Sequence, residues 1–482
     1  MSMYGNEVGA TTRLPGNSLG LFETSASTMA NIAPALSVFL TIPFLVAEMG
    51  TMAPWIFILA AVAILCTGVA VIEFTKRLPS AGGFISYITN GASSGGEKSG
   101  TVMGSVAFYL LLLAYPVSIS SLAAFFGYWL QTYFSLSPDT WIYFAVASIL
   151  LAIPFLLKGT GVSVKMAFAL FVLEAAVLVI FSIIIFIKNP SAMNAPFHSV
   201  SGLGFKGMAG LSFSFAFFGF VGWENSAPLA EEARDPGRTI PRTIIISVGV
   251  CMVVFFLAAY ALVVGFVGWQ GATAGIHSLA TYAYAAPYLT LSAHFTPYLH
   301  LLMFLVGLSS ALGGVLAASL PATRYFYHGA RAGLLPKSVA KVNAKTGVPH
   351  VAMWVYIVSV LTVTIVLDLI LHNGVTISGD ESGISTVPLL IVYALTSLFL
   401  PFFITKRDPQ NFNVLRHVIV PYFGMAVVGY GIWSTIKPGQ AFPANTYVWY
   451  VLAYVVVALV GAIYGVSRRT ASHALLASGL ND

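Results

Sequence analysis

The stretch Phe217-Phe-Gly-Phe-Val-Gly-Trp-Glu-Asn-Ser-Ala-Pro228 decides the fold of this 482-residue chain. Its aromatic and aliphatic side chains suit lipid or a protein core, but its two glycines weaken a helix. Pro228 ends regular helical hydrogen bonding, and Glu224 and Asn225 are polar groups that do not face lipid. The stretch therefore predicts a membrane helix that is broken, with its polar groups turned toward a protein interior or a cavity.

The composition of the whole chain also indicates a membrane protein. The chain is 58% hydrophobic and only 8% charged, whereas soluble proteins carry about 25% charged residues. So few ionisable groups cannot cover a soluble fold of this size, which excludes a soluble enzyme, a nucleic-acid-binding protein and a disordered protein. Cys66 and Cys251 lie in apolar runs, so they indicate small buried side chains rather than a disulfide framework.

Apolar runs of about 20 residues are long enough to cross the hydrocarbon as helices. They predict an all-α integral membrane protein with twelve transmembrane helices. The twelve runs are 27–50, 51–75, 102–133, 140–158, 163–187, 207–230, 239–269, 298–328, 350–371, 384–404, 412–436 and 444–467. An even number of crossings leaves both termini on the same side of the membrane.

The basic residues predict which side that is. Of the 22 lysines and arginines, all but Lys188, Lys206 and Lys437 fall on one alternate set of loops and tails. Cytoplasmic loops carry the excess of basic residues. We therefore expect a multi-pass protein of the plasma membrane with both termini in the cytoplasm.

The first predicted span is interrupted in the same way as the sixth. Pro34 lies inside an apolar run that starts at Thr28, where it removes a backbone donor and clashes with the preceding turn. The two breaks are five helices apart, and an odd offset inverts the second copy relative to the first. Two inverted five-helix repeats that meet at broken helices are typical of a secondary transporter with its substrate at the midplane. The alternative is that both breaks are kinks that serve packing alone.

Unwound helices offer two kinds of binding group. Half-helix N-termini expose N–H groups that suit a carboxylate, and half-helix C-termini expose carbonyl groups that suit an ammonium. The substrate-binding candidates in the first span are Asn31, Ile32, Ala33, Pro34, Ala35, Leu36 and Ser37. Those in the sixth span are Phe217, Phe218, Gly219, Phe220, Gly222, Trp223 and Glu224, whose aromatic members could occlude a substrate or stack on an amine. Hydroxyl groups at mid-depth add Tyr115, Ser118, Ser309 and Ser310.

Two carboxyl groups lie deep in the predicted bilayer. Glu174 is about 14 Å from Lys165 and about 21 Å from Lys188 along a helix. An ionised carboxylate at the bilayer centre costs about 2.5–3.5 kcal/mol or more, so the group is protonated, paired or hydrated. We expect Glu174 to couple transport to protons; a structural hydrogen bond to a neighbouring helix is the alternative. Glu224 could attract an amine, sense protons or hold the unwound segment.

Three other acidic residues are expected near the membrane surfaces. Glu73 precedes Lys76 and Arg77 by three and four residues, which predicts an interfacial ion pair. Glu48 adjoins the turn between the first two spans, and Asp368 lies near the outer end of the ninth.

The cytoplasmic loops resemble those of the amino acid–polyamine–organocation superfamily of permeases. The strongest match is FFGFVGWENSAPLAEEARDPGRTIPR, from Phe217 to Arg242. Residues 78–87 are similar to the Pro-x-x-Gly-Gly-x-Tyr-x-Tyr segment of the family, and residues 324–349 to its loop after span eight. The resemblance implies a LeuT-type fold: a 5+5 inverted repeat with discontinuous helices 1 and 6, two C-terminal helices and alternating access. It also implies amino-acid or amine substrates. Glu224 falls where several relatives have a glutamate tied to substrate or proton sensing. Glu174 falls near the position in helix five where some proton-coupled relatives carry a lysine.

The first span departs from the family pattern. It reads Ala33-Pro-Ala-Leu-Ser37 where many members carry a Gly-Ser/Thr-Gly element that grips the substrate carboxylate. The contact that this element makes with the substrate carboxylate in the family is therefore not expected in this chain. Gly313 and Gly314 in the eighth span offer no hydroxyl groups to sodium, which favours protons or exchange.

The sequence thus predicts four parts: a cytoplasmic tail (1–26), two five-helix repeats (27–206 and 207–404), and two last helices with a tail (405–482). The predicted function is secondary active amino-acid transport, by proton symport or exchange. It needs a small-molecule substrate and a lipid bilayer, but no cofactor, metal or nucleic acid; the oligomeric state is left open. A polyamine or monoamine carrier is the alternative, favoured by the altered first span. The histidines are scattered, which argues against a membrane-embedded enzyme. The sequence has no G-x-x-x-x-G-K-[ST] phosphate-binding loop, which argues against an ATP-driven pump. A channel or a non-transporting receptor is not excluded by the sequence.

Overall fold

The structure is a computed structural model that describes residues 10–11, 16, 18–209, 211–281, 286–371, 374–439 and 444–467. Across these residues the chain is helical apart from loops and one short antiparallel pair of strands, β1 (Ala10–Thr11) and β2 (Val342–Asn343). The predicted cytoplasmic tails lie mostly outside the described residues.

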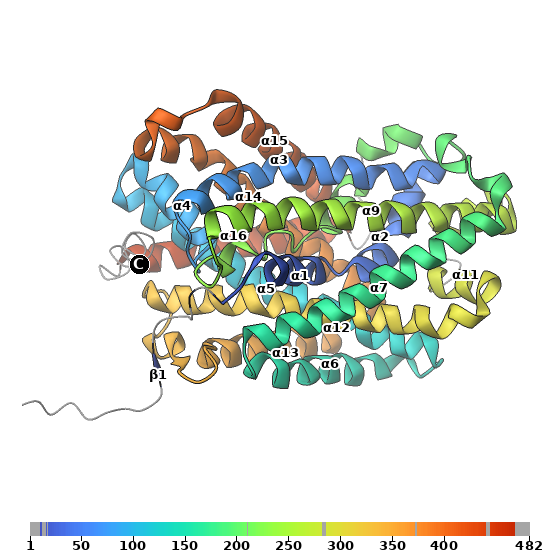
Figure 1. Cartoon of the computed structure of the whole chain (residues 1–482), viewed down its shortest axis with the longest axis horizontal. Helices are drawn as coiled ribbons and strands as arrows, with labels where there is room; N and C mark the ends of the chain where they lie inside the picture. Colours follow the sequence, from blue (N-terminus) through green and yellow to red (C-terminus); the bar gives the residue numbers. More distant parts are fainter. Residues whose placement is uncertain are drawn as a thin grey trace, which may run out of the picture.

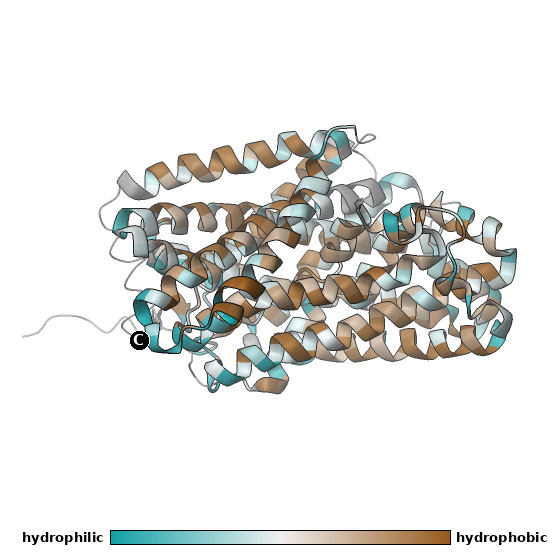
Figure 2. Cartoon of the chain, turned by 90° about the horizontal axis from the view of Figure 1, so that it is seen from above, coloured by the Kyte–Doolittle hydropathy of each residue, from teal (hydrophilic) through white to brown (hydrophobic). Residues whose placement is uncertain are grey.

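The helices are α1 (Leu21–Ile32), α2 (Pro34–Met49), α3 (Ile56–Arg77), α4 (Phe84–Ala92), α5 (Glu97–Tyr133), α6 (Trp141–Leu157), α7 (Thr160–Lys188), α8 (Leu211–Phe218), α9 (Pro236–Gln270), α10 (Ala272–Ala280), α11 (Pro287–Phe295), α12 (His300–Arg331), α13 (His350–Leu371), α14 (Gly374–Arg407), α15 (Val420–Ile436) and α16 (Tyr447–Ser467). The long helices run along the long axis of the molecule (Figure 1). Apolar residues cover most of their length, and hydrophilic residues gather toward their ends (Figure 2).

Within the described residues, ten helical runs are long and apolar enough to cross a membrane. The prediction of an all-helical membrane protein agrees with this finding. The number differs from twelve for two reasons. The first run, Leu21–Arg77, has 57 residues and covers the first two predicted spans. The sixth predicted span contains α8, whose eight residues are too few to cross a bilayer.

The packing places α1 in the middle of the molecule. It contacts α7, α9 and α12, and Figure 1 shows it end-on among the longer helices. Every residue of α1 from Thr24 to Ile32 is buried. Large apolar side chains on outer helices are instead exposed, among them Tyr143, Val358, Trp449 and Ile463. An apolar outer surface around a core that contains polar groups is what a lipid environment requires.

The two interrupted helices follow directly from the sequence. α1 ends at Ile32 and α2 begins at Pro34, with Ala33 between them in the left-handed conformation (φ 48°). Proline is well suited to the first position of a helix because its N–H group is missing and its φ is already helical. The left-handed alanine costs about 1 kcal/mol or more, and hydrogen bonds to Ala30 and from Ser37 hold it in place.

In the sixth span, regular helix stops at Phe218. Turns follow over residues 219–226, and a short 3-10 turn spans Ala227–Leu229 before α9 starts at Pro236. Gly222 has φ +106°, and a Cβ atom there would lie 2.8 Å from the Asn31 side-chain nitrogen. Only glycine fits this position, which explains why the helix breaks there.

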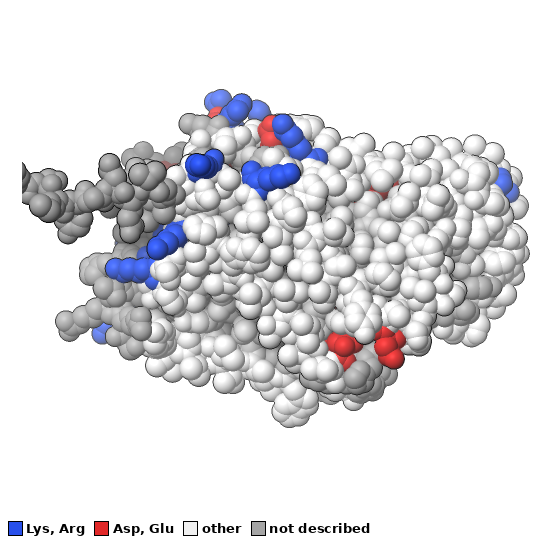
Figure 3. All heavy atoms as spheres, turned by 90° about the horizontal axis from the view of Figure 1, so that it is seen from below, with Lys and Arg blue, Asp and Glu red and all other residues white. Residues whose placement is uncertain are grey.

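Basic side chains gather toward one end of the molecule in Figure 3. At the end of α3, buried Glu73 pairs with Lys76 (3.2 Å) and Arg77 (2.7 Å), which confirms the predicted ion pair. Arg416, just before α15, also pairs with Glu73. Arg77 bridges further to Asp408 at 2.7 Å, and its hydrogen bond lowers the pKa of that carboxyl group. The network therefore joins the end of α3 to Asp408, just after α14, and to Arg416, just before α15.

Glu48 has a more specific place than the surface position predicted for it. Its carboxylate accepts hydrogen bonds from the Ser212 N–H (2.8 Å) and hydroxyl group (2.5 Å). A carboxylate at a helix N-terminus satisfies free donors and complements the helix dipole. Glu48 therefore joins the end of α2 to the start of α8.

Candidate functional site

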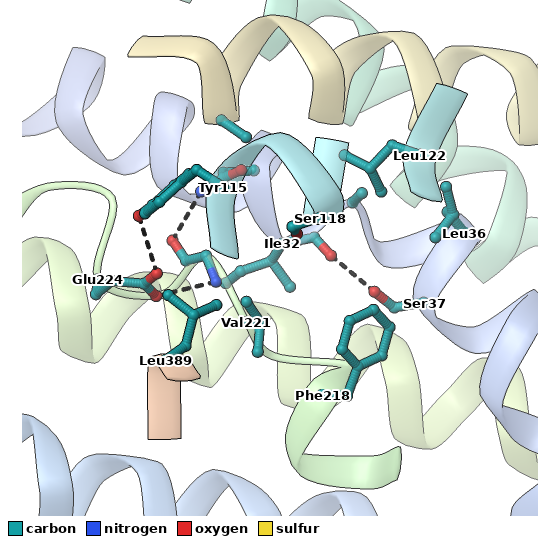
Figure 4. Close-up of a pocket in the computed structure, with 14 residues that line it drawn as sticks. Ile32, Leu36, Ser37, Tyr115, Ser118, Leu122, Phe218, Val221, Glu224 and Leu389 are labelled. Atoms are coloured by element: carbon teal, nitrogen blue, oxygen red, sulfur yellow. Dashed lines mark hydrogen bonds between the residues drawn. The ribbon is translucent and has the colours of Figure 1, made fainter. Parts of the chain in front are cut away.

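A cavity lies between the two interrupted helices (Figure 4). Its walls come from α1, α2, α5, α12, α14 and the irregular segment after α8. The residues that line it are Asn31, Ile32, Ala33, Leu36, Ser37, Tyr115, Ser118, Leu122, Phe218, Val221, Gly222, Glu224, Ala318 and Leu389. The space inside is about 30 Å³, room for about two water molecules. The cavity is therefore narrow, and lining side chains must move before a larger molecule fits.

The structure brings ten of the predicted candidates to this cavity. They are Asn31, Ile32, Ala33, Leu36, Ser37, Tyr115, Ser118, Phe218, Gly222 and Glu224. Glu224 and Tyr115 point toward each other on one side, and Phe218 lies near Ser37 on the other (Figure 4). Four lining residues were not predicted, namely Leu122, Val221, Ala318 and Leu389. Leu122, Ala318 and Leu389 are ordinary apolar residues of other membrane helices, so no local sequence signal marks them. Val221 lies within the break of the sixth span, but its side chain is neither polar nor aromatic.

The other candidates lie outside the cavity lining. Phe220 packs edge-on against Phe255, with ring centroids 4.7 Å apart. Trp223 packs in the same way against Tyr393 at 5.3 Å. The Ser309 hydroxyl group donates to the carbonyl group of its own helix at Val306. Pro34, Ala35, Phe217, Gly219 and Ser310 are also absent from the lining.

Glu224 is the acidic group of the cavity. Its side chain is buried and accepts hydrogen bonds from the Gly222 N–H (3.0 Å) and the Tyr115 hydroxyl group (3.3 Å). Tyr325 and Tyr393 lie close enough to interact electrostatically with the same carboxyl group. Three tyrosines thus surround the carboxyl group, and it also holds the irregular segment in shape.

Side-chain amides join the two interrupted helices. The Asn31 amide nitrogen donates to the Gly222 carbonyl group at 3.4 Å. The Asn225 amide nitrogen donates to the Ser27 hydroxyl group (2.9 Å) and carbonyl group (3.1 Å). These bonds connect α1 to the sixth span, so a movement of one affects the other.

Glu174 occupies a different place, behind the cavity wall at the start of α2. Its carboxyl group accepts a hydrogen bond from the Ala35 N–H at 3.1 Å. The Ser310 hydroxyl group accepts from the Leu36 N–H at 3.0 Å and hydrogen-bonds to the Glu174 carboxyl group. Two side chains from α7 and α12 therefore cap the half-helix that begins at Pro34.

A second set of ion pairs joins α12 to the segment before α9. Arg324 of α12 forms a fully buried pair with Glu232 at 2.7 Å. The Glu232 carbonyl group accepts hydrogen bonds from the N–H groups of Ser18 and Leu19, just before α1. A further pair joins Arg331 to the neighbouring glutamate, Glu231, at 3.3 Å. The sequence motif contains these acids, but it does not reveal their partners.

In the part of the chain that the structure describes, no three His, Cys, Asp or Glu side chains are grouped so as to hold a metal ion. The polar groups that line the cavity are those of one carboxyl group, hydroxyl groups and one amide.

Residues 19–463 match the model of the family described as amino acid permease. The chain is 24% identical over 330 residues to the branched-chain amino acid permease BcaP of Bacillus subtilis, covering 62% of this chain and 64% of that protein. It is 22% identical over 413 residues to the vacuolar cationic amino acid transporter 8 of Arabidopsis thaliana, covering 81% and 64%.

A third relative, the BcaP permease of Lactococcus lactis, is 30% identical over 221 residues, which cover 43% of each chain. The chain thus spans less than two thirds of the length of these relatives. The family model covers nearly the whole chain, and the loop motifs resemble the same permeases. The chain therefore belongs to the amino acid permease family.

Proposed function

We propose that the protein is a secondary active transporter of an amino acid or a related amine, which binds in the cavity between the interrupted helices. The observation that carries the proposal is the buried Glu224 carboxyl group at the junction of two interrupted helices. Half-helix ends and a carboxylate at mid-membrane bind small charged substrates. The names of the relatives, permeases and transporters of branched-chain or cationic amino acids, support the same class of substrate.

We also propose twelve crossings in a LeuT-type arrangement, with repeats at 27–206 and 207–404 and with the basic side in the cytoplasm. The 57-residue first run supports this count because it is about 85 Å long as a helix, nearly three times the hydrocarbon thickness. The interrupted sixth span supplies the remaining crossing. Alternating access then opens the cavity to each side in turn, and the buried Arg324–Glu232 pair closes the cytoplasmic side.

Uptake into liposomes tests the proposed function. We expect the purified, reconstituted protein to take up at least one labelled amino acid or amine, with saturation and with competition by the unlabelled compound. Uptake should increase when a proton gradient is imposed. Protein-free liposomes are the control. Flux that rises without saturation would point to a channel instead, and no uptake of any compound would reject transport.

Proton coupling is assigned to Glu174 and Glu224 because both are carboxyl groups buried within the membrane-spanning helices. Glu174 contacts both α12 and the start of α2. Ionised, it complements the positive N-terminus of α2; protonated, it loses that attraction. A change in its protonation would therefore alter how firmly α2 is held, which is the property that a proton-coupled conformational change requires.

Replacing Glu174 with glutamine is expected to flatten the pH dependence of uptake while the protein still folds. Glutamine keeps an oxygen acceptor for the Ala35 N–H but cannot bind or release a proton. The measurement is the initial uptake rate between pH 5 and pH 8, compared with wild type and with Glu381→Gln. Glu381 is a suitable control because it is another buried carboxyl group of a membrane helix and lies outside the cavity lining. An unchanged pH profile in Glu174→Gln would reject the assignment.

A further inference from the structure

The start of α2 has no backbone donor left for a substrate. A helix N-terminus normally presents its first N–H groups without partners. Here Pro34 has no N–H, the Ala35 N–H donates to Glu174 and the Leu36 N–H donates to Ser310. The next N–H, of Ser37, already makes a helical bond to Ala33. The anion that such a half-helix would attract is thus supplied by the protein itself.

The irregular segment of the sixth span gives the same result. The N–H groups of Val221 and Trp223 donate to carbonyl groups within the segment, and that of Asn225 to Gly222. The Gly222 N–H donates to the Glu224 carboxyl group. These four N–H groups are therefore bound within the protein, in contrast to a site built to hold a carboxylate through free N–H groups.

Three of the four side-chain donors that line the cavity are engaged as well, and the fourth, the Ser118 hydroxyl group, carries no charge. Tyr115 donates to Glu224, Ser37 donates to the Ile32 carbonyl group and Asn31 donates to the Gly222 carbonyl group. Among the described residues that line the cavity, Lys, Arg and His do not occur. A substrate carboxylate would therefore enter a buried site beside the Glu224 carboxyl group without a cation to balance it. Burying a charge without a partner is strongly unfavourable.

An ammonium group finds the opposite situation. The Glu224 carboxylate lines the cavity and carries the negative charge that attracts an ammonium group. The C-terminus of α1 at Ile32 adds the partial negative charge of a helix end. The Tyr115 ring lies in the cavity wall, and aromatic rings attract cations. All three features attract positive charge and repel negative charge.

We infer that the transported molecule is an organic amine without a carboxylate beside its amino group, a monoamine or polyamine rather than an α-amino acid. The inference rests on the proposed transport function and narrows its substrate class. Because the half-helix of α2 is capped by Glu174, this chain binds the amine end of its substrate and has no counterpart for the acid end.

Matched sets of three compounds test this inference. One set is leucine, leucinamide and 3-methylbutylamine; others are arginine, argininamide and agmatine, and lysine, lysinamide and cadaverine. Each amide has the size of its amino acid but lacks the negative charge, so it separates charge from steric fit. The full chain is reconstituted in liposomes, labelled members of each set are offered, and unlabelled members compete for uptake.

We expect the amine and the amide of at least one set to compete about tenfold or more better than the amino acid, which corresponds to about 1.4 kcal/mol. An amino acid that competes as well as its amine would overturn the inference and leave transport intact. If the amide fails together with the amino acid, size and not charge excludes them, and the inference is wrong. Saturable uptake of no compound in any set would reject the proposed function itself, and the inference with it.

Discussion

Replacing Arg324 with methionine is expected to destabilise the folded protein by about 3–5 kcal/mol, because it leaves the Glu232 carboxylate buried without its partner. The Arg324 side chain is 2% exposed and the Glu232 side chain 0% exposed, at a distance of 2.7 Å. Methionine keeps the apolar stem of arginine, so the change removes the charge and the hydrogen bonds rather than most of the packing. The measurement is thermal unfolding in detergent, with the amount of correctly folded protein after extraction as a second readout.

Two controls make this result specific. Arg238→Met breaks the exposed pair with Asp235, whose side chains are 78% and 60% exposed, and should cost at most about 1 kcal/mol. The double variant Arg324→Met with Glu232→Met removes both buried charges and should recover most of the lost stability. Equal shifts of the unfolding temperature for Arg324→Met and Arg238→Met would show that the buried pair contributes no more to stability than the exposed pair.

The interruptions of the fold could be predicted from local sequence because single residues cause them. Pro34 cannot continue a helix that starts before it, and the structure starts α2 at this residue. Gly222 is required by a close contact with Asn31, which lies 191 residues away in the sequence. The sequence does not reveal this contact, but the low helix propensity of glycine alone predicts a weak point in the helix. The exact ends of the sixth span could not be predicted, because residues 219–226 form turns that are held by side chains of other helices.

The site was less accessible to sequence reasoning than the breaks that surround it. Lining residues on the interrupted helices were predicted except for Val221, since position along the break identifies them. Ala318 and Leu389 reach the cavity from α12 and α14, and only the packing of these helices decides that. The depth of Glu174 in the membrane could be predicted from its distance to the flanking lysines. Its hydrogen bond to Ala35 could not, because the two residues are 139 positions apart in the sequence.

One buried carboxyl group was not considered at all. The tenth span was predicted to begin at residue 384, but α14 starts earlier and its apolar run includes Glu381, which is 2% exposed. A carboxyl group within an apolar run lowers hydropathy and shifts the predicted boundary past it. Position alone therefore cannot separate a carboxyl group at the membrane surface from one inside the helix bundle.

Replacing Glu224 with glutamine is expected to weaken substrate binding by about ten- to a hundredfold, since a hydrogen bond to a charged group contributes about 1.5–3 kcal/mol. The change conserves shape and size but removes the negative charge from the cavity wall. It also replaces one acceptor oxygen with an NH₂ group. In the wild-type protein the two oxygens accept from the Gly222 N–H and the Tyr115 hydroxyl group, and an NH₂ group cannot accept either bond. The affinity is measured by competition against the best substrate of the wild-type protein.

Two variants separate charge from structure in this experiment. Tyr115→Phe removes one hydrogen bond to the same carboxyl group but leaves its charge in place, so it should weaken binding by about tenfold or less. Glu381→Gln makes the same chemical change outside the cavity lining, so the substrate affinity should stay at the wild-type value. If Glu224→Gln binds substrate as tightly as wild type and keeps its pH response, Glu224 only holds the irregular segment. The cation would then have to be bound by the backbone carbonyl groups at the end of α1.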